Sequence, residues 1–188
     1  MYEEKISRIR EELCHLGAEG VVLTHPDNVY YATGFESVMD GWRLPEPISG
    51  VYIPSSESEA IVLLLPEASI ISLLVAEREG YPVHFQALKT FDLLNFCVMG
   101  RSEDLYLKHE EKAGERLAHF SGLVEGECEP DIVCALSEMI KKRSIQKKLI
   151  LFDDMRIGFK LNQSLEQLYE DAFDMFFRVR LIKTKEEI

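Results

Sequence analysis

The sequence lacks the features that assign many proteins to a class at first sight. Its four cysteines, Cys14, Cys97, Cys128 and Cys134, are scattered and form no C-x-x-C pair, so neither a zinc site nor a disulfide framework is indicated. No apolar run approaches the roughly 20 residues that span a bilayer, and the first residues lack the apolar segment of a signal peptide. These absences favour a cytoplasmic protein with reduced thiols and no membrane partner.

Positive charge is also scarce. The 21 lysines and arginines stand against 33 aspartates and glutamates, which gives a formal net charge of −12. Such a chain has no basic surface to displace counterions from phosphates, so we expect neither nucleic acid nor an anionic membrane as a partner. Hydrophobic residues make up 46% of the 188 positions, which is enough to build the core of one domain.

The hydrophobic pattern alternates between helices and short strands, which is typical of an α/β layer fold with a largely buried sheet. Amphipathic spacing, prolines at helix starts and glycines after helix ends predict helices at 3–16, 26–34, 66–79, 105–120, 130–143 and 162–172, the last capped by Asn162. Val/Ile/Leu-rich runs predict strands at 20–24, 50–54, 60–66, 81–86, 147–154 and 173–182. A loop is expected at 36–49, and 91–100 fits either a helix or a strand.

No catalytic machinery is visible in the sequence. The five histidines lack the spacing of metal ligands, and there is no G-x-S-x-G, G-x-G-x-x-G or P-loop motif. Asp153 and Asp154 follow a predicted strand, where active sites of α/β folds often lie, but adjacent residues of a strand point to opposite faces. Capping of the next element is therefore favoured over a shared metal. We expect no catalytic residue and no metal ligand in this chain.

Two segments resemble those of a known family. Residues 25–35, HPDNVYYATGF, resemble the P-x-N-x-x-Y-x-T-G-[FY] segment of the creatinase/prolidase/aminopeptidase P family. The last residues, RLIKTKEEI, are similar to the R-x-I-K-[ST]-x-x-E-[IL] junction at which the N-terminal domain of that family meets its catalytic domain. Their order and separation also match. We therefore expect this N-terminal domain at 1–178 and the start of the junction at 179–188.

The resemblance implies a three-layer α/β fold, in which a mixed β-sheet of about six strands is flanked by helices in ribonuclease H-like layers. It also implies that the chemistry belongs to a following "pita-bread" domain, where two divalent metals (Mn, Co or Zn) activate a water for attack on the bond before proline. This chain alone would then not be an enzyme, whereas the longer protein would be a hydrolase of the Xaa-Pro dipeptidase or aminopeptidase type. Its implied partners are its own catalytic domain, a second copy in a homodimer, and a peptide or small-molecule substrate.

The same resemblance assigns roles to individual residues. Structural roles within the two motifs are implied for Asn28, Tyr31, Thr33, Gly34, Arg180 and Lys183.

A place near the substrate is implied for Phe35, Trp42 and Arg43, because the loop after the T-G-[FY] segment supplies aromatic and arginine side chains to the pocket in family members. Trp42, the only tryptophan, fits an anchor packed on the sheet as well as a pocket role. Arg43 either binds a substrate carboxylate or is a solvated charge.

Two alternative functions stay open. Creatinase and ectoine hydrolase share this type of domain and cleave other C–N bonds, and residues 91–147 are longer here than in the compact prolidase version. A stand-alone binding module without a catalytic domain is the second alternative. Continuation of the reading frame beyond Ile188, and activity on Xaa-Pro dipeptides with Mn²⁺, would separate these readings.

Overall fold

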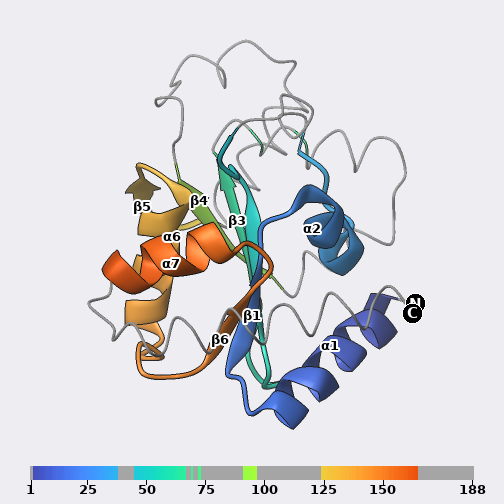
Figure 1. Cartoon of the computed structure of the whole chain (residues 1–188). Coiled ribbons are helices and arrows are strands. Elements are labelled where there is room, and N and C mark those ends of the chain that lie inside the picture. The colour runs from blue at the N-terminus through green and yellow to red at the C-terminus, as the bar shows by residue number, and fades with distance from the viewer. Residues whose placement is uncertain are drawn as a thin grey trace.

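A mixed sheet occupies the centre of the computed structural model, which describes residues 2–37, 45–66, 69, 72, 91–96 and 124–164 (Figure 1). In the described part of the chain the sheet has six strands: β1 (Gly20–Leu23), β2 (Gly50–Pro54), β3 (Ile61–Pro66), β4 (Phe91–Phe96), β5 (Val124–Glu129) and β6 (Ile150–Phe152). Their order across the sheet is β5-β4-β3-β2-β1-β6.

The pairing of β1 decides which polar residues meet at the edge of the sheet. β1 runs antiparallel to β2, and β2 runs antiparallel to β3. The pairs β3–β4, β4–β5 and β1–β6 are parallel. Since Val22 is in register with Phe152, the carboxyl ends of β1 and β6 lie side by side. The residues that follow them, Thr24 and Asp153, are therefore neighbours although they are far apart in the chain.

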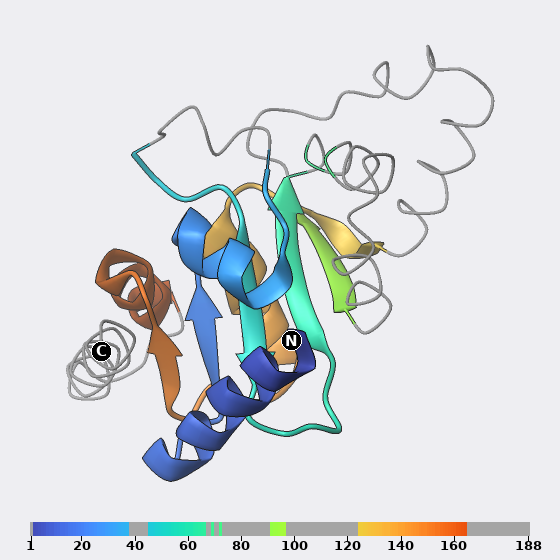
Figure 2. The same ribbon diagram turned by 90° about the vertical axis from the view of Figure 1, so that its right-hand side faces the viewer.

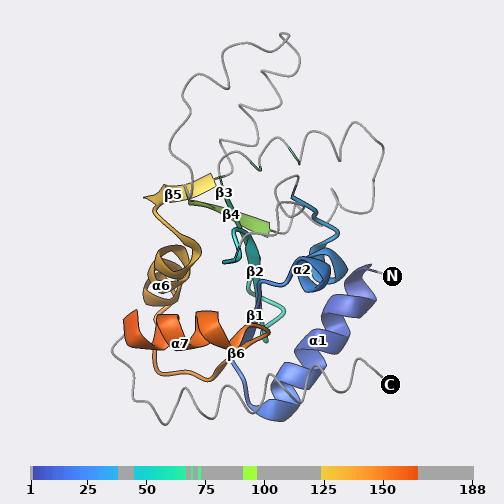
Figure 3. The ribbon, with the colours of Figure 1, turned by 45° about the horizontal axis from the view of Figure 1, so that its top comes forward.

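Helices cover both faces of the sheet. α1 (Tyr2–Leu16) and α2 (Pro26–Thr33) lie on one face, and α6 (Ile132–Lys142) and α7 (Met155–Ser164) lie on the other (Figures 2 and 3). Every residue of β2 and β3 is buried, as expected for strands enclosed on both faces. The largest fully buried side chains come from α1, the central strands, α6, β6 and α7: Tyr52, Phe152, Leu13, Ile53, Leu63, Leu64, Leu136, Ile140, Leu151 and Ile157. The expected three-layer α/β fold with a mixed sheet is confirmed.

Most of the predicted elements in the described part of the chain are confirmed. α1, α2 and α6 and the strands β1 to β3 lie within a residue or two of their predicted bounds. The ambiguous segment 91–100 contains the strand β4. The predicted elements at 81–86, 105–120 and 173–182, with most of 66–79 and of 162–172, lie outside the described residues.

Two expectations need correction, and one strand was not predicted. The strand predicted at 147–154 is only Ile150–Phe152, and β5 was not predicted as a strand. Asn162 is not a helix N-cap: it is 4% exposed and lies inside α7, which begins seven residues earlier at Met155. The helix starts early because Asp154 accepts a hydrogen bond from the backbone N–H of Arg156 and because Ile157 and Leu161 give it an apolar face.

Candidate functional site

The carboxylate of Asp153 holds the turn from β1 into α2. Its Oδ1 accepts hydrogen bonds from the backbone N–H of Thr24 (2.8 Å) and from Thr24 Oγ1 (3.0 Å). Its Oδ2 accepts from the backbone N–H of His25 (2.9 Å) and from Asn28 Nδ2 (2.8 Å). α2 starts with Pro26, and the N-cap residue His25 makes no side-chain capping bond. Asp153 thus supplies, from β6, the negative charge and the acceptor that the start of this helix lacks.

The other end of α2 is closed by its own residues. Gly34 has φ 69° and ψ 6°, a left-handed conformation, and its N–H donates to the carbonyl of Tyr30. The Oγ1 of Thr33 donates to the carbonyl of Val29 (2.7 Å) and accepts from the N–H of Phe35 (3.0 Å). The chain therefore leaves the helix in one fixed direction, toward the segment 36–49.

Tyr31 connects α2 to α1. Its side chain is partly exposed, with the ammonium of Lys5 4.4 Å from the ring centroid and Nη2 of Arg8 3.5 Å from the phenol oxygen. Phe35, expected near the substrate, is 6% exposed and belongs to the hydrophobic core. In the described part of the chain its side chain therefore anchors the segment that follows α2.

The segment after α2 is also tied to the rest of the molecule. Ser37 Oγ and Ser69 Oγ are 2.7 Å apart and both residues are buried. Trp42 and Arg43 lie outside the described residues, as do Arg180 and Lys183. Their proposed roles stay predictions.

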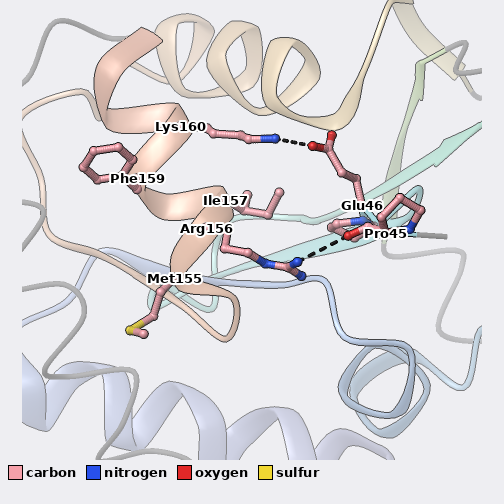
Figure 4. A pocket seen from close by; sticks show the side chains of 8 residues that line it. Pro45, Glu46, Met155, Arg156, Ile157, Phe159 and Lys160 are labelled. Carbon is pink, nitrogen blue, oxygen red and sulfur yellow. Dashed lines mark hydrogen bonds and ion pairs between the residues drawn. The ribbon is translucent and has the colours of Figure 1, made fainter. Parts of the chain in front are cut away.

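The chain returns at Pro45, beside α7, and a groove of about 680 Å³ opens there (Figure 4). Its apolar lining comes from two prolines and three side chains of α7: Pro45, Pro47, Met155, Ile157 and Phe159. Glu46, Arg156 and Lys160 supply its charges. A volume of a few hundred cubic ångströms suits a small molecule or a short stretch of peptide.

Two polar contacts cross this groove. Arg156 Nη1 donates to the carbonyl of Pro45 (3.3 Å), and Lys160 forms an ion pair with Glu46. The guanidinium of Arg156 is itself held by Asp154, with Nε 3.1 Å from Oδ1 and Nη2 2.7 Å from Oδ2. These hydrogen bonds, and the charge of Asp154, raise the pKa of Arg156, which stays cationic.

The two adjacent aspartates therefore serve different elements. Asp153 holds the start of α2, whereas Asp154 caps α7 and orients Arg156. The capping role expected for this pair is confirmed for Asp154. The contacts of Arg156 and Lys160 were not predicted, since they depend on partners that are 111 and 114 positions away.

Metal ions have no ligand set in the described residues, where no group of three or more His, Cys, Asp or Glu side chains could hold one. The pair of divalent metals implied by the family does not fit the residues described. Across the described ranges, none of the helices is both long enough and apolar enough to cross a membrane.

Fold and site together define a three-layer α/β domain whose polar contacts hold Ser37 and Pro45, the residues on either side of 38–44. The sequence from residue 5 to residue 173 matches the family described as the Creatinase/Prolidase N-terminal domain. The chain belongs to this family. No curated protein gives a significant sequence match.

Several solved structures are similar to the chain. An aminopeptidase P, a Xaa-Pro aminopeptidase from Streptococcus thermophilus, is 14% identical with a TM-score of 0.42, and the alignment covers 93% of this chain and 97% of that one. The Creatinase/Prolidase N-terminal domain of an X-Pro dipeptidase from Streptococcus pyogenes is 17% identical with a TM-score of 0.29, covering 65% and 98%. A prolidase from Thermococcus sibiricus is 16% identical with a TM-score of 0.30, covering 87% of this chain and 50% of that chain. With identities and scores this low, the family assignment depends on the sequence match.

Proposed function

We propose that this chain is the non-catalytic N-terminal domain of a metal-dependent hydrolase of the Xaa-Pro peptidase type, and that it shapes the substrate pocket of that enzyme. The family match over 5–173 carries the proposal. The catalytic centre, with two divalent metals (Mn, Co or Zn), would then belong to a following domain. Its partners would be that domain, a second copy in a homodimer, and the substrate, in the cytoplasm.

Within this proposal, Trp42 and Arg43 reach the substrate. They belong to the segment between Phe35, which follows α2, and Pro45, which lies beside α7, and described contacts hold both of these residues. An aromatic ring and a bidentate donor are suited to an extended peptide and to its carboxylate. A rigid scaffold that carries a variable loop is a common arrangement for binding residues.

The test requires the longer protein that includes the catalytic domain. With Mn²⁺ and a Xaa-Pro dipeptide, Arg43→Ala should lower kcat/KM about tenfold to a hundredfold, the value expected when a charge-assisted contact is lost. Trp42→Ala should lower it as well, with metal content and Tm unchanged. Lys147→Ala, which removes an exposed cation between α6 and β6, is the control and should retain full activity.

Full activity in Arg43→Ala, together with a lowered Tm in Trp42→Ala, would refute the pocket role and leave the tryptophan as a structural anchor. Activity on creatine-like or other small C–N substrates, without activity on Xaa-Pro dipeptides, would move the enzyme to the non-peptidase branch of the family. A reading frame that ends at Ile188 would favour a stand-alone module.

A further inference from the structure

Arg156, in the first turn of α7, contacts the segment 36–49 at Pro45. Arg156 is 70% exposed, yet it curls back over the start of its own helix to meet Asp154, which is 19% exposed. Residues two apart in a helix do not face each other, so the pair is possible only because Asp154 precedes the helix and caps it. An exposed ion pair of this kind contributes little to stability. Its geometry instead directs Nη1 of Arg156 at the carbonyl of Pro45.

Lys160 provides a second point of attachment. It lies four residues after Arg156, on the same face of α7, and pairs with Glu46 (Figure 4). Two stacked side chains of one helix therefore hold two consecutive residues of the returning segment. Pro45 and Pro47 flank Glu46, and their rings fix the backbone φ angles there. A stiff tripeptide that is held at two points has a defined position and a defined direction.

The beginning of the same segment is held independently. The left-handed Gly34, the bond from Phe35 N–H to Thr33 and the buried contact between Ser37 and Ser69 fix where the chain departs. Seven residues, 38–44, connect Ser37 to Pro45. In general, a chain segment that is tied at both ends has fewer accessible conformations than one that is tied at a single end.

We propose that Arg156 and Lys160 of α7, with Asp154 behind Arg156, are positioning residues that set where the segment carrying Trp42 and Arg43 meets α7. We call this set, with Pro45 and Glu46, the α7 clamp. It acts on the loop through Pro45 and Glu46 and touches no substrate. Its importance for catalysis rests on the proposed function, but its action on the loop does not.

Trp42 makes the clamp testable in this chain alone, because it is the only tryptophan and lies three positions before Pro45. The variant is Arg156→Gln combined with Lys160→Gln, and the measurement is acrylamide quenching and anisotropy of tryptophan fluorescence. We expect the quenching constant to change about twofold, the size of population change that two exposed ion pairs can support. The far-UV circular dichroism should not change.

The matched control is Arg143→Gln combined with Lys141→Gln. Arg143 also binds a carboxylate and a backbone carbonyl, those of Glu59 and Ala60, and Lys141 also pairs with a glutamate, Glu138. The control thus removes the same kinds of contact at α6 and should leave the quenching of Trp42 at the wild-type value, even if Tm falls.

A charge exchange separates positioning from general stability. Glu46→Lys alone should shift the quenching of Trp42, because it faces Lys160 with a like charge. Glu46→Lys combined with Lys160→Glu restores the pair and should return the quenching to the wild-type value.

The proposal is overturned if the double variant at 156 and 160 quenches like the wild type, if the α6 control changes quenching equally, or if the charge exchange gives no recovery. Failure of the proposed function would give a different combination of fluorescence and kinetic results. In that case the clamp variants alter Trp42 fluorescence as described, while Trp42→Ala and Arg43→Ala leave kcat/KM of the longer enzyme unchanged.

Discussion

Replacement of Asp153 by asparagine is the most informative perturbation of the fold around the site. The carboxylate accepts four hydrogen bonds, two on each oxygen. In Asp153→Asn, the remaining oxygen can still accept from Thr24, but the new amide nitrogen faces the backbone N–H of His25, which is also a donor, and the amide of Asn28 must turn to offer its oxygen. The variant therefore loses the charge assistance of all four bonds and gains one unfavourable donor–donor contact, with the N–H of His25.

The expected cost follows from these bonds. A hydrogen bond to a charged group contributes about 1.5–3 kcal/mol, and solvent replaces part of this loss because Asp153 is half-buried. We expect a decrease of about 2 kcal/mol in the free energy of unfolding, or a Tm that is lower by about 4–8 °C for a chain of this size. Urea and thermal unfolding followed by circular dichroism measure both quantities.

Asp27→Asn is the matched control, because Asp27 is in the first turn of the same helix and its side chain is 92% exposed. It makes the same chemical change and reports the charge effect at the helix start, which should stay within about 0.5 kcal/mol. In a double-mutant cycle, Asp153→Asn and Asn28→Ala should couple by at least about 0.5 kcal/mol. Equal stabilities for Asp153→Asn and Asp27→Asn would refute the assignment of Asp153 as the residue that holds the β1–α2 turn.

Four further predictions follow from other parts of the structure. Gly34→Val should cost about 1 kcal/mol or more, because φ is 69° at this position, and an unchanged Tm would contradict the role of the left-handed turn. Gly20→Ala should cost about 1–3 kcal/mol, because its Cβ would lie 2.5 Å from the buried ring of Tyr52; unfolding in urea measures this, and wild-type stability would mean that the ring can move. Burial, and to a lesser extent Glu59, raises the pKa of Tyr52 well above its ordinary value. The unfolded chain therefore releases this proton at a lower pH than the folded chain, and the free energy of unfolding should fall as the pH rises above about 10. In Tyr52→Phe this part of the alkaline loss of stability should disappear. Finally, this chain should retain no stoichiometric Mn²⁺ after dialysis and should not hydrolyse Xaa-Pro dipeptides, and metal analysis with turnover measurements would expose the opposite result.

The sequence predicted those elements whose signals are local. α2 is an example, because Pro26 favours a helix start and Gly34 a left-handed end, and both functions depend on backbone conformation alone. The buried strands β2 and β3 were equally clear, since continuous Val/Ile/Leu runs need a cover on both faces.

The missed elements depend on tertiary pairing. β4 (Phe91–Phe96) is a short apolar run that fits a helix as well as a strand, and its parallel pairing with β3 decides between them. β5 has the sequence VEGECE, in which glycine and three glutamates disfavour a strand, and pairing with β4 overrides this preference. Asn162 was misread because it precedes a helix-like pattern, although Asp154 was the better capping candidate eight residues earlier.

The candidate site shows the same division. The helix α2 and its end at Gly34 could be recognised from their residues, but the partner of Asn28 could not, because Asp153 reaches it only through the parallel register of β1 and β6. In the same way, nothing local connects Pro45 to Arg156. Contacts that depend on the order of strands in a sheet need the fold before they can be named.

Asp153 contacts the start of α2, whereas Asp154 contacts Arg156 of α7. This division has a consequence for protein engineering and for divergence within the family. The carboxylates fix the frame of the loop from outside it, and so changes at 38–44 need not disturb the strands or the helix caps. Loops that a rigid scaffold carries generally tolerate substitution and insertion better than strands do. A library built at these seven positions should therefore yield folded proteins that differ mainly in what they bind.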